Sequence, residues 1–159
     1  GSEDVYKRQA MELGKLYAIQ TTASTTEGAQ YVYCKKLVKN ETGERPLYTG
    51  YHSTVSAFYY GTLIVGDQFD GNFDGYSALD TNIPLSSLKE PTAFDSPTTF
   101  AVASVIPGWT AALQLMRAGE RWMLYIPWQS AYGSSGNNDG TIPGYTALTF
   151  DLLLERIVE

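Results

Sequence analysis

The chain of 159 residues contains a single cysteine and a single histidine. With Cys34 alone, an internal disulfide and a cysteine-cluster metal site are both excluded. A free cysteine within the alternating segment Tyr-Val-Tyr-Cys indicates a buried structural thiol. Any catalytic triad would have to use His52, which lies in a Gly-Tyr-His-Ser segment, and the chain has no nucleophile elbow. We therefore interpret His52 as a solvated loop residue.

Basic residues are also scarce, because 11 Lys and Arg stand against 17 Asp and Glu, giving a net charge of −6. A nucleic-acid-binding surface needs a basic excess to neutralise phosphates, so we expect no nucleic-acid partner. The chain has no apolar run of about 18 residues, and we expect no membrane span. The remaining composition, 43% hydrophobic and 18% charged, is typical of a globular domain.

The segment Asp-Gly-Asn-Phe-Asp-Gly, residues 70–75, matches the first half of a calcium-binding loop. The twelfth position of such a loop falls at Thr81, whereas a bidentate glutamate is needed there. We interpret the segment as a turn rich in Gly and Asp. The glycine-rich residues 133–140 lack the Gly-Lys-Ser/Thr ending of a phosphate-binding loop. The sequence therefore predicts neither a metal nor another cofactor.

Alternating apolar residues predict strands within an α+β fold. After Pro107 and Gly108, apolar residues at 109, 112, 113 and 116 form one stripe, which predicts a short amphipathic helix. Four or five strands with one such helix indicate a sheet wrapped over the helix. The predicted strands cover residues 29–38, 53–64, 98–104, 121–127 and 146–157.

The N-terminal part has a different pattern. Val5, Leu13, Leu16 and Ile19 roughly follow helical spacing, which predicts a helix over residues 4–20. The polar residues 21–28 then predict a linker, so that 1–28 form a helical extension and 29–159 form the sheet-rich domain. Residues 65–97 show little regular pattern. We interpret 71–97 as a long insertion, and long ordered insertions often have a function.

Several short motifs resemble those of FKBP-type peptidyl-prolyl cis-trans isomerases. Ser-Val-Ile-Pro-Gly-Trp, residues 104–109, resembles the entry to the single helix of this family. Tyr-Tyr-Gly-Thr-Leu at 59–63 and Gly-Asp-Gln-Phe-Asp at 66–70 resemble its Tyr-x-Gly-x-Leu and Gly-x-x-Phe-Asp segments. Further matches, in the family's order, are Ala-Tyr-Gly at 131–133, Ile-Pro at 142–143 and Leu-Thr-Phe-Asp at 148–151. The resemblance spans residues from about 50 to 158.

The resemblance implies an antiparallel, twisted sheet over the helix and a pocket with assigned roles. Trp109 would form the pocket floor, and Ser104 would contribute to substrate binding. The backbone N–H of Ile106 and the hydroxyl of Tyr132 would bind two carbonyls of a prolyl segment. Asp70 would accept a hydrogen bond from a wall tyrosine. The implied walls are Tyr59, Phe69, Val105, Ile106, Ile142 and Phe150.

The chain also departs from the family pattern. A further aromatic is expected at the position of Thr98, by spacing from Phe100, and the basic residue that commonly follows the Phe-Asp pair is missing. The segment Asn137–Asp139 differs in composition, and the insertion after Asp70 is longer than in the minimal domain. The amino-acid sequences of the motifs resemble those of a subgroup of exported lipoproteins from Bacteroides-like bacteria. We therefore expect a periplasmic or outer-membrane-anchored protein, whose signal segment is not part of this sequence.

The resemblance implies an isomerase that accelerates rotation about Xaa-Pro bonds in exported proteins. Its expected partners are proline-containing polypeptides, and macrolide inhibitors are further candidate ligands. A non-catalytic chaperone or peptide-binding module using the same groove remains an alternative. A third hypothesis is an interaction domain of the cell envelope, with the predicted helix 4–20 as its docking element.

Overall fold

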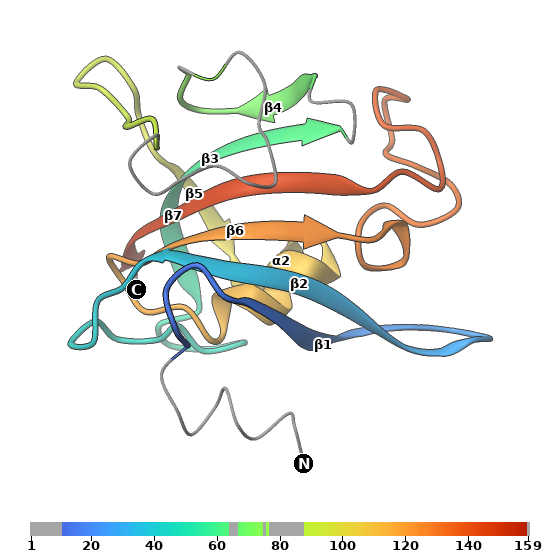
Figure 1. Ribbon diagram of the computed structural model, residues 1–159, viewed down its shortest axis with the longest axis horizontal. Helices are drawn as coiled ribbons and strands as arrows, with labels where there is room; N and C mark the ends of the chain where they lie inside the picture. The colour runs from blue at the N-terminus through green and yellow to red at the C-terminus, as the bar shows by residue number, and fades with distance from the viewer. Residues whose placement is uncertain (1–10, 64–66, 75, 77–87, 159) are drawn as a thin grey trace.

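The computed structural model describes residues 11–63, 67–74, 76 and 88–158. These residues form a seven-stranded antiparallel sheet in the order β1-β2-β6-β7-β3-β4, with β5 also paired to β3 (Figure 1). The fold is therefore the expected α+β type, with more strands than the five predicted. The strands are β1 (Leu16–Thr25), β2 (Gly28–Val38), β3 (Thr54–Leu63), β4 (Gln68–Gly71), β5 (Thr98–Ala101), β6 (Arg121–Ile126) and β7 (Leu148–Val158).

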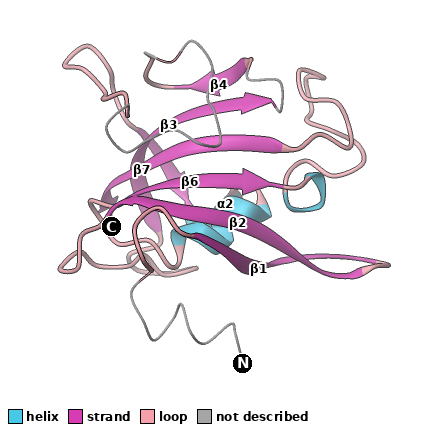
Figure 2. Ribbon diagram, in the orientation of Figure 1, coloured by secondary structure: helices cyan, strands magenta, loops and turns pink. Residues whose placement is uncertain are grey.

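The helix α2 (Pro107–Leu113) lies against one face of this sheet (Figure 2). Proline at its first turn favours the start of the helix, because the missing N–H would have no partner there. The 3₁₀ turn η2 (Val102–Ser104) leads from β5 into the helix. Thr110 fixes this junction, because its hydroxyl donates to the carbonyl of Val102 at 2.7 Å.

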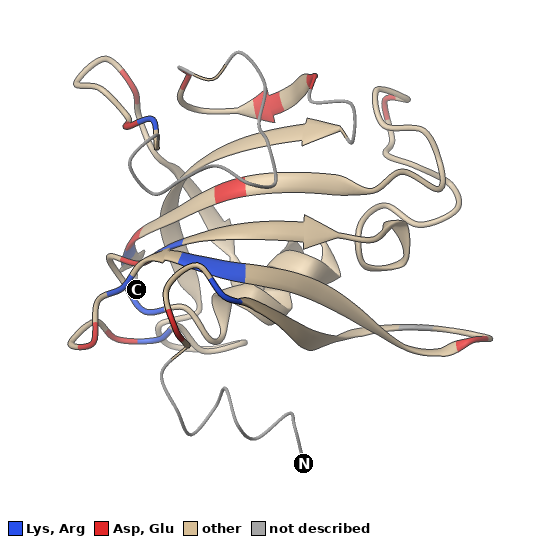
Figure 3. Ribbon diagram, in the orientation of Figure 1, with Lys and Arg blue, Asp and Glu red and all other residues tan. Residues whose placement is uncertain are grey.

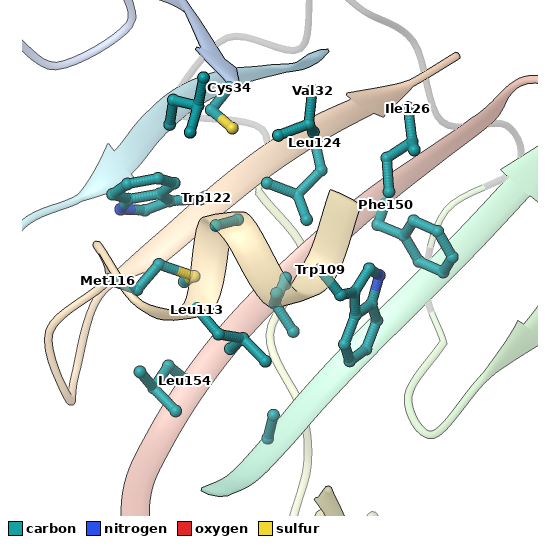
Figure 4. Packing of buried hydrophobic residues seen from close by; sticks show 14 of the residues in the cluster. Val32, Cys34, Trp109, Leu113, Met116, Trp122, Leu124, Ile126, Phe150 and Leu154 are labelled. Atoms are coloured by element: carbon teal, nitrogen blue, oxygen red, sulfur yellow. The ribbon is translucent and has the colours of Figure 1, made fainter. Parts of the chain in front are cut away.

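The main hydrophobic core lies between α2 and the sheet. In Figure 4, Trp109 of the helix lies beside Phe150 of β7, and Leu113 points toward Leu154 of the same strand. The predicted alternation on β6 is confirmed for this face, where Trp122, Leu124 and Ile126 are buried. Cys34 is also fully buried in this core, as the sequence predicted, and burial raises the pKa of its thiol.

The opposite face of the sheet carries a second hydrophobic cluster, formed by Leu37, Tyr60, Phe73 and Met123. Phe73 belongs to the segment that the sequence analysis interpreted as an insertion, yet it is only 1% exposed. Tyr76 and Leu88, from the same segment, pack against the cluster. The described parts of the insertion therefore bury apolar surface on the outer face of the sheet.

A buried ion pair fastens the insertion to the same face. Arg121 of β6 donates to both carboxylate oxygens of Asp151 of β7, at 2.8 and 2.6 Å. It also donates to Glu90 at 2.9 Å and to the carbonyl of Lys89. The hydroxyl of Tyr76 donates to Asp151 at 2.7 Å. Burial alone would lower the pKa of Arg121, but the hydrogen bonds and charge of Asp151 raise it.

The predicted helix over residues 4–20 is wrong where the structure describes it. Residues 11–15 form no helix, and residues 16–20 belong to β1, which pairs with β2. Leu13 and Leu16, which suggested a helical stripe, are 44% and 50% exposed, whereas Ile19 is buried against the core. The spacing was therefore coincidental, and the alternation of Tyr17 and Ile19 was the relevant pattern. Residues 1–10 lie outside the described part.

The predicted linker over residues 21–28 is wrong as well, because β1 extends to Thr25 and a turn joins it directly to β2. The sheet therefore begins before the predicted domain boundary at residue 29. The five predicted strands are confirmed with small shifts, except that residues 102–104 form η2 rather than strand. Within the described residues, no helix is long and apolar enough to cross a bilayer.

Candidate functional site

A cavity of about 330 Å³ opens between the start of α2, the strands β3 and β4, and the loop after η3 (Trp128–Ser130). This volume lies at the lower end of the range for small-molecule and peptide side-chain pockets. Nine of the ten lining residues carry roles implied by the family resemblance, and Phe100 is the exception. The lining residues are Tyr59, Phe69, Asp70, Phe100, Ser104, Val105, Ile106, Trp109, Tyr132 and Phe150.

Trp109 lies at the centre of the aromatic wall. Its ring packs edge-to-face with Phe100, Phe150 and Tyr59, at centroid distances of 5.0, 5.2 and 5.3 Å. Such pairs each contribute about 0.5–1.5 kcal/mol beyond area burial. The rings therefore hold one another in place before any ligand binds.

Strand register brings two of these rings to the cavity. Tyr59 of β3 and Phe150 of β7 lie on neighbouring strands, with Gly61 directly opposite Phe150. A Cβ atom at Gly61 would lie 2.6 Å from a ring carbon of Phe150 and 3.0 Å from the ring of Phe69. Glycine at this position therefore leaves room for the edge-to-face pair of Phe69 and Phe150, whose centroids are 5.5 Å apart.

Replacing Gly61 with alanine should push these two rings out of place. We expect a loss of about 1–3 kcal/mol in the free energy of unfolding, as for overpacked cores, and a clear fall in ligand affinity at the cavity. Urea unfolding and peptide titration measure both quantities. Adding Phe150→Leu to Gly61→Ala should relieve part of the destabilisation, because the nearest ring carbon is removed. Wild-type stability and affinity in Gly61→Ala would contradict this assignment.

The helix meets the sheet at a second glycine. A Cβ atom at Gly108 would lie 2.7 Å from Cγ2 of Ile126 on β6. The absence of a side chain there lets the first turn of α2 approach the sheet closely and places the next residue, Trp109, deep in the cavity wall.

The polar edge of the cavity consists of Tyr59, Tyr132 and Asp70. Burial, a hydrogen bond to the side chain of Asp70 and the charge of that carboxylate all raise the pKa of Tyr59. Burial and then the negative charges of Asp70 and Asp139 raise the pKa of Tyr132. Both phenols therefore stay protonated at neutral pH and are able to donate hydrogen bonds.

The start of α2 supplies a backbone donor. Ile106 precedes the helix, and its carbonyl accepts hydrogen bonds from the N–H groups of Trp109 and Thr110, at 3.0 and 3.1 Å. Its own N–H has no backbone acceptor among the described residues. The Ile106 N–H and the Tyr132 hydroxyl thus provide two donors beside an aromatic floor.

Ile142 does not lie in the cavity wall, where the family resemblance implied it would be. It lies instead in the core at 2% exposure. Its N–H donates to the side chain of Asn137 at 2.8 Å, and its carbonyl accepts from the N–H of Asn137 at 3.0 Å. In this structure it supports the loop that carries Tyr132 rather than forming a wall.

Sequence reasoning missed two residues at the site. Phe100 lines the cavity, although the family pattern implied an aromatic at position 98, where this chain has threonine. Thr98 instead accepts a hydrogen bond from Asn72 at 3.0 Å. Asn72 also accepts from the N–H of Tyr59 at 2.8 Å and donates to the carbonyl of Ala57 at 3.0 Å. It thus joins β3 to β5 and fixes the backbone of a pocket tyrosine, so its side chain is used between strands rather than in a calcium loop.

The family model of FKBP-type peptidyl-prolyl cis-trans isomerases matches residues 49–155. The chain belongs to this family. All ten residues that line the cavity fall within the matched part of this FKBP chain.

Individual proteins agree with this membership. The macrophage infectivity potentiator of Trypanosoma cruzi is 52% identical over 76 residues, which are 44% of this chain and 38% of that protein. The outer membrane protein MIP of Legionella longbeachae is 40% identical over 106 residues, 67% of this chain and 34% of that protein. This FKBP chain therefore spans well under half the length of these relatives.

A solved structure agrees at the level of the fold. The peptidyl-prolyl cis-trans isomerase of Pseudomonas syringae superposes with a TM-score of 0.59 at 29% identity. The match covers 87% of this FKBP chain and 81% of that one. The similarity therefore extends beyond the cavity to most of the sheet.

Proposed function

We propose that the chain is a peptidyl-prolyl cis-trans isomerase, which accelerates rotation about Xaa-Pro bonds by desolvation and orientation in its aromatic cavity. The observation that carries this proposal is the arrangement of two hydrogen-bond donors, the Ile106 N–H and the Tyr132 hydroxyl, beside the apolar floor formed by Trp109. Membership of the FKBP family supports it.

The chemistry suits such a cavity. Rotation about a peptide bond has a barrier of about 18–20 kcal/mol because it breaks amide resonance. Before proline the cis and trans states differ by only about 0.5–1 kcal/mol, yet they exchange in tens to hundreds of seconds. The planar amide is the more dipolar state, and water stabilises it more than the twisted state. An apolar cavity removes this water and so lowers the relative free energy of twisting.

No covalent bond forms or breaks in this reaction, so the groups at the cavity only need to bind and orient. The Ile106 N–H and the Tyr132 hydroxyl hold the carbonyls on either side of the proline, and Trp109 supports its ring. Asp70 holds the Tyr59 hydroxyl and presents a polar edge to the rotating amide. Lowering the barrier by about 5 kcal/mol accelerates exchange by between three and four powers of ten. Ser104, Val105, Phe69 and Phe150 complete the substrate-binding surface.

The clients of the isomerase are proline-containing polypeptides exported to the cell envelope. The relative named outer membrane protein MIP supports this location, as does the resemblance to exported lipoproteins. Macrolide inhibitors of the family are expected to compete for the same cavity. The proposed location includes anchoring of the protein to the outer membrane by a lipid.

A protease-free assay tests the activity directly. A peptide of the form Ala-Xaa-Pro-Phe, with an uncharged Xaa, is transferred from a solvent that enriches the cis isomer, and its relaxation to equilibrium is followed by absorbance. We expect catalytic amounts of the protein to increase the relaxation rate in proportion to protein concentration. Relaxation at the rate of the protein-free control, with the protein still folded, would contradict the proposal.

The same protein preparation also tests the alternative that the domain is a non-catalytic chaperone. If the domain suppresses aggregation of an unfolded client without accelerating the peptide relaxation, it is a peptide-binding chaperone that uses the cavity for capture. The described part of the insertion, which covers the outer face of the sheet, would then be the next region to examine for client binding.

A further inference from the structure

The charge around the cavity is of one sign. Among the described residues that line it, Asp70 is the only charged one. Asp139 lies in the loop that follows Tyr132, and its negative charge, like that of Asp70, acts on the Tyr132 hydroxyl. A peptide bound across this cavity therefore passes the carboxylate of Asp70 and contacts a tyrosine on which the charge of Asp139 also acts.

Within the part of the chain that the structure describes, neither carboxylate forms an ion pair with a cation. Asp70 accepts hydrogen bonds from the N–H of Gly71, at 2.8 Å, and from Tyr59. Asp139 accepts from the N–H and the hydroxyl of Thr141, at 3.0 and 2.7 Å. Among the described residues, the ion pairs of the chain involve other carboxylates, namely Glu12, Glu41, Glu44, Glu90, Glu120, Asp151 and Glu155.

The distribution of basic residues explains this difference. In Figure 3 the Lys and Arg segments gather in the left-hand half of the molecule, where β6 begins, whereas the loop between η3 and β7 on the right carries red only. The residue that follows the Phe69-Asp70 pair is Gly71, which carries no charge. The rim of the cavity is therefore left with an uncompensated negative potential.

One residue of the cavity wall carries a buried donor. The Nε1 of Trp109 is buried and has no hydrogen-bond partner among the described residues, although Trp109 is 4% exposed and lines the cavity. A largely apolar cavity lined by a few polar side chains, here Tyr59, Asp70, Ser104 and Tyr132, indicates a ligand site. The acidic rim thus flanks a binding cavity rather than forming an isolated surface cluster.

We infer that this cavity selects prolyl segments in which a residue next to the proline is Lys or Arg. The inference rests on the proposed isomerase function and names its substrate class. A cation at the rim gains Coulomb energy from Asp70 and Asp139, whereas a carboxylate is repelled by both. Because these are partly exposed charges, the expected preference is modest, roughly three- to tenfold in kcat/KM at low salt.

Matched peptides measure this preference in the protease-free assay. The residue before proline is Lys in one peptide and its uncharged analogue norleucine in a second, and Glu in a third and Gln in a fourth. We expect the ratio of kcat/KM for Lys over norleucine to exceed one and that for Glu over Gln to fall below one. Both ratios should approach one at about 1 M sodium chloride, where charges are screened within about 3 Å.

Two variants locate the effect. Asp139→Asn removes the rim charge but keeps an acceptor for Thr141, so the norleucine rate should stay unchanged while the Lys preference falls by about half or more. Asp95→Asn is the matched control, because Asp95 also accepts from the N–H and the hydroxyl of a threonine, Thr92, at 2.7 and 3.1 Å. Asp95 belongs to a loop on the opposite side of Figure 1 from the loop after η3.

Each outcome decides one claim. A Lys preference that depends on salt and is reduced by Asp139→Asn alone supports the inference. Equal rates for all four peptides overturn the inference and leave the proposed function standing. If Asp139→Asn and Asp95→Asn reduce the Lys preference equally, the inference is also overturned, because the preference would then come from the net charge of the protein. If the norleucine and Gln peptides are not accelerated at all, the proposed function itself fails.

Discussion

Replacing Trp109 with leucine should lower kcat/KM for an uncharged Xaa-Pro peptide by about 100-fold, equivalent to about 2.7 kcal/mol of transition-state stabilisation. The indole packs edge-to-face with Tyr59, Phe100 and Phe150, so its removal opens the floor of the cavity to water. Entry of water restores the preferential solvation of the planar amide and therefore raises the barrier to rotation. Rates are measured per folded molecule, with the folded fraction taken from urea unfolding.

A second tryptophan provides the control. Trp122 is buried in the same core at 1% exposure, but it does not line the cavity. Trp122→Leu should destabilise the protein by about 3 kcal/mol or more, as large core truncations do, and leave the rate per folded molecule near that of the wild type. If both variants lower the rate equally, loss of core packing rather than loss of the cavity floor explains the effect.

Replacing Asp151 with asparagine should destabilise the protein by about 3–5 kcal/mol, because it leaves the Arg121 guanidinium buried without its main counterion. Arg121 and Asp151 are 1% and 0% exposed, so water cannot solvate the remaining charge. Asparagine has nearly the same shape as aspartate, so the decrease in the free energy of unfolding results from removal of the charge rather than from a change in packing. The measurement is the free energy of unfolding in urea.

Glu90→Gln is the matched control for this prediction. Glu90 pairs with the same guanidinium at 2.9 Å, but its side chain is 69% exposed. Exposed ion pairs contribute about 0–1 kcal/mol, so this variant should lose little stability. The double variant Arg121→Met and Asp151→Leu, which removes both buried charges, should recover much of the loss in Asp151→Asn. Equal effects of Asp151→Asn and Glu90→Gln would contradict the assignment of Arg121 and Asp151 as the main anchor.

Local patterns in the sequence predicted the central strands and the helix correctly. Strand β6 alternates visibly, and α2 follows a proline and carries a regular apolar stripe, so each element is recognisable from its own residues. The N-terminal strand β1 was not recognisable in this way. It is a strand because it pairs with β2, and Leu16 at its start and Leu13 before it happened to fall at helical spacing.

The candidate site was predictable where short motifs carry it, as for Trp109 and Tyr132. It was not predictable where contacts between distant segments determine which residues lie at the site. Asn72 reaches across from the end of β4 to β3 and β5, and only the folded chain brings these strands together. On β5 the ring of Phe100 lines the cavity, and Thr98 accepts a hydrogen bond from Asn72 instead. Spacing along the sequence does not record which of these two residues contributes to the cavity.

The most direct test of the account is exchange spectroscopy by NMR on one uncharged Xaa-Pro peptide at equilibrium with a catalytic amount of the protein. Uncatalysed exchange is too slow to give cross-peaks between the cis and trans signals. The account predicts such cross-peaks with the wild-type protein, their loss with Trp109→Leu, and peptide-induced shifts at the indole signal of Trp109 and at Tyr132. Absence of cross-peaks with the folded wild-type protein, or shifts confined to residues outside the cavity, would contradict it.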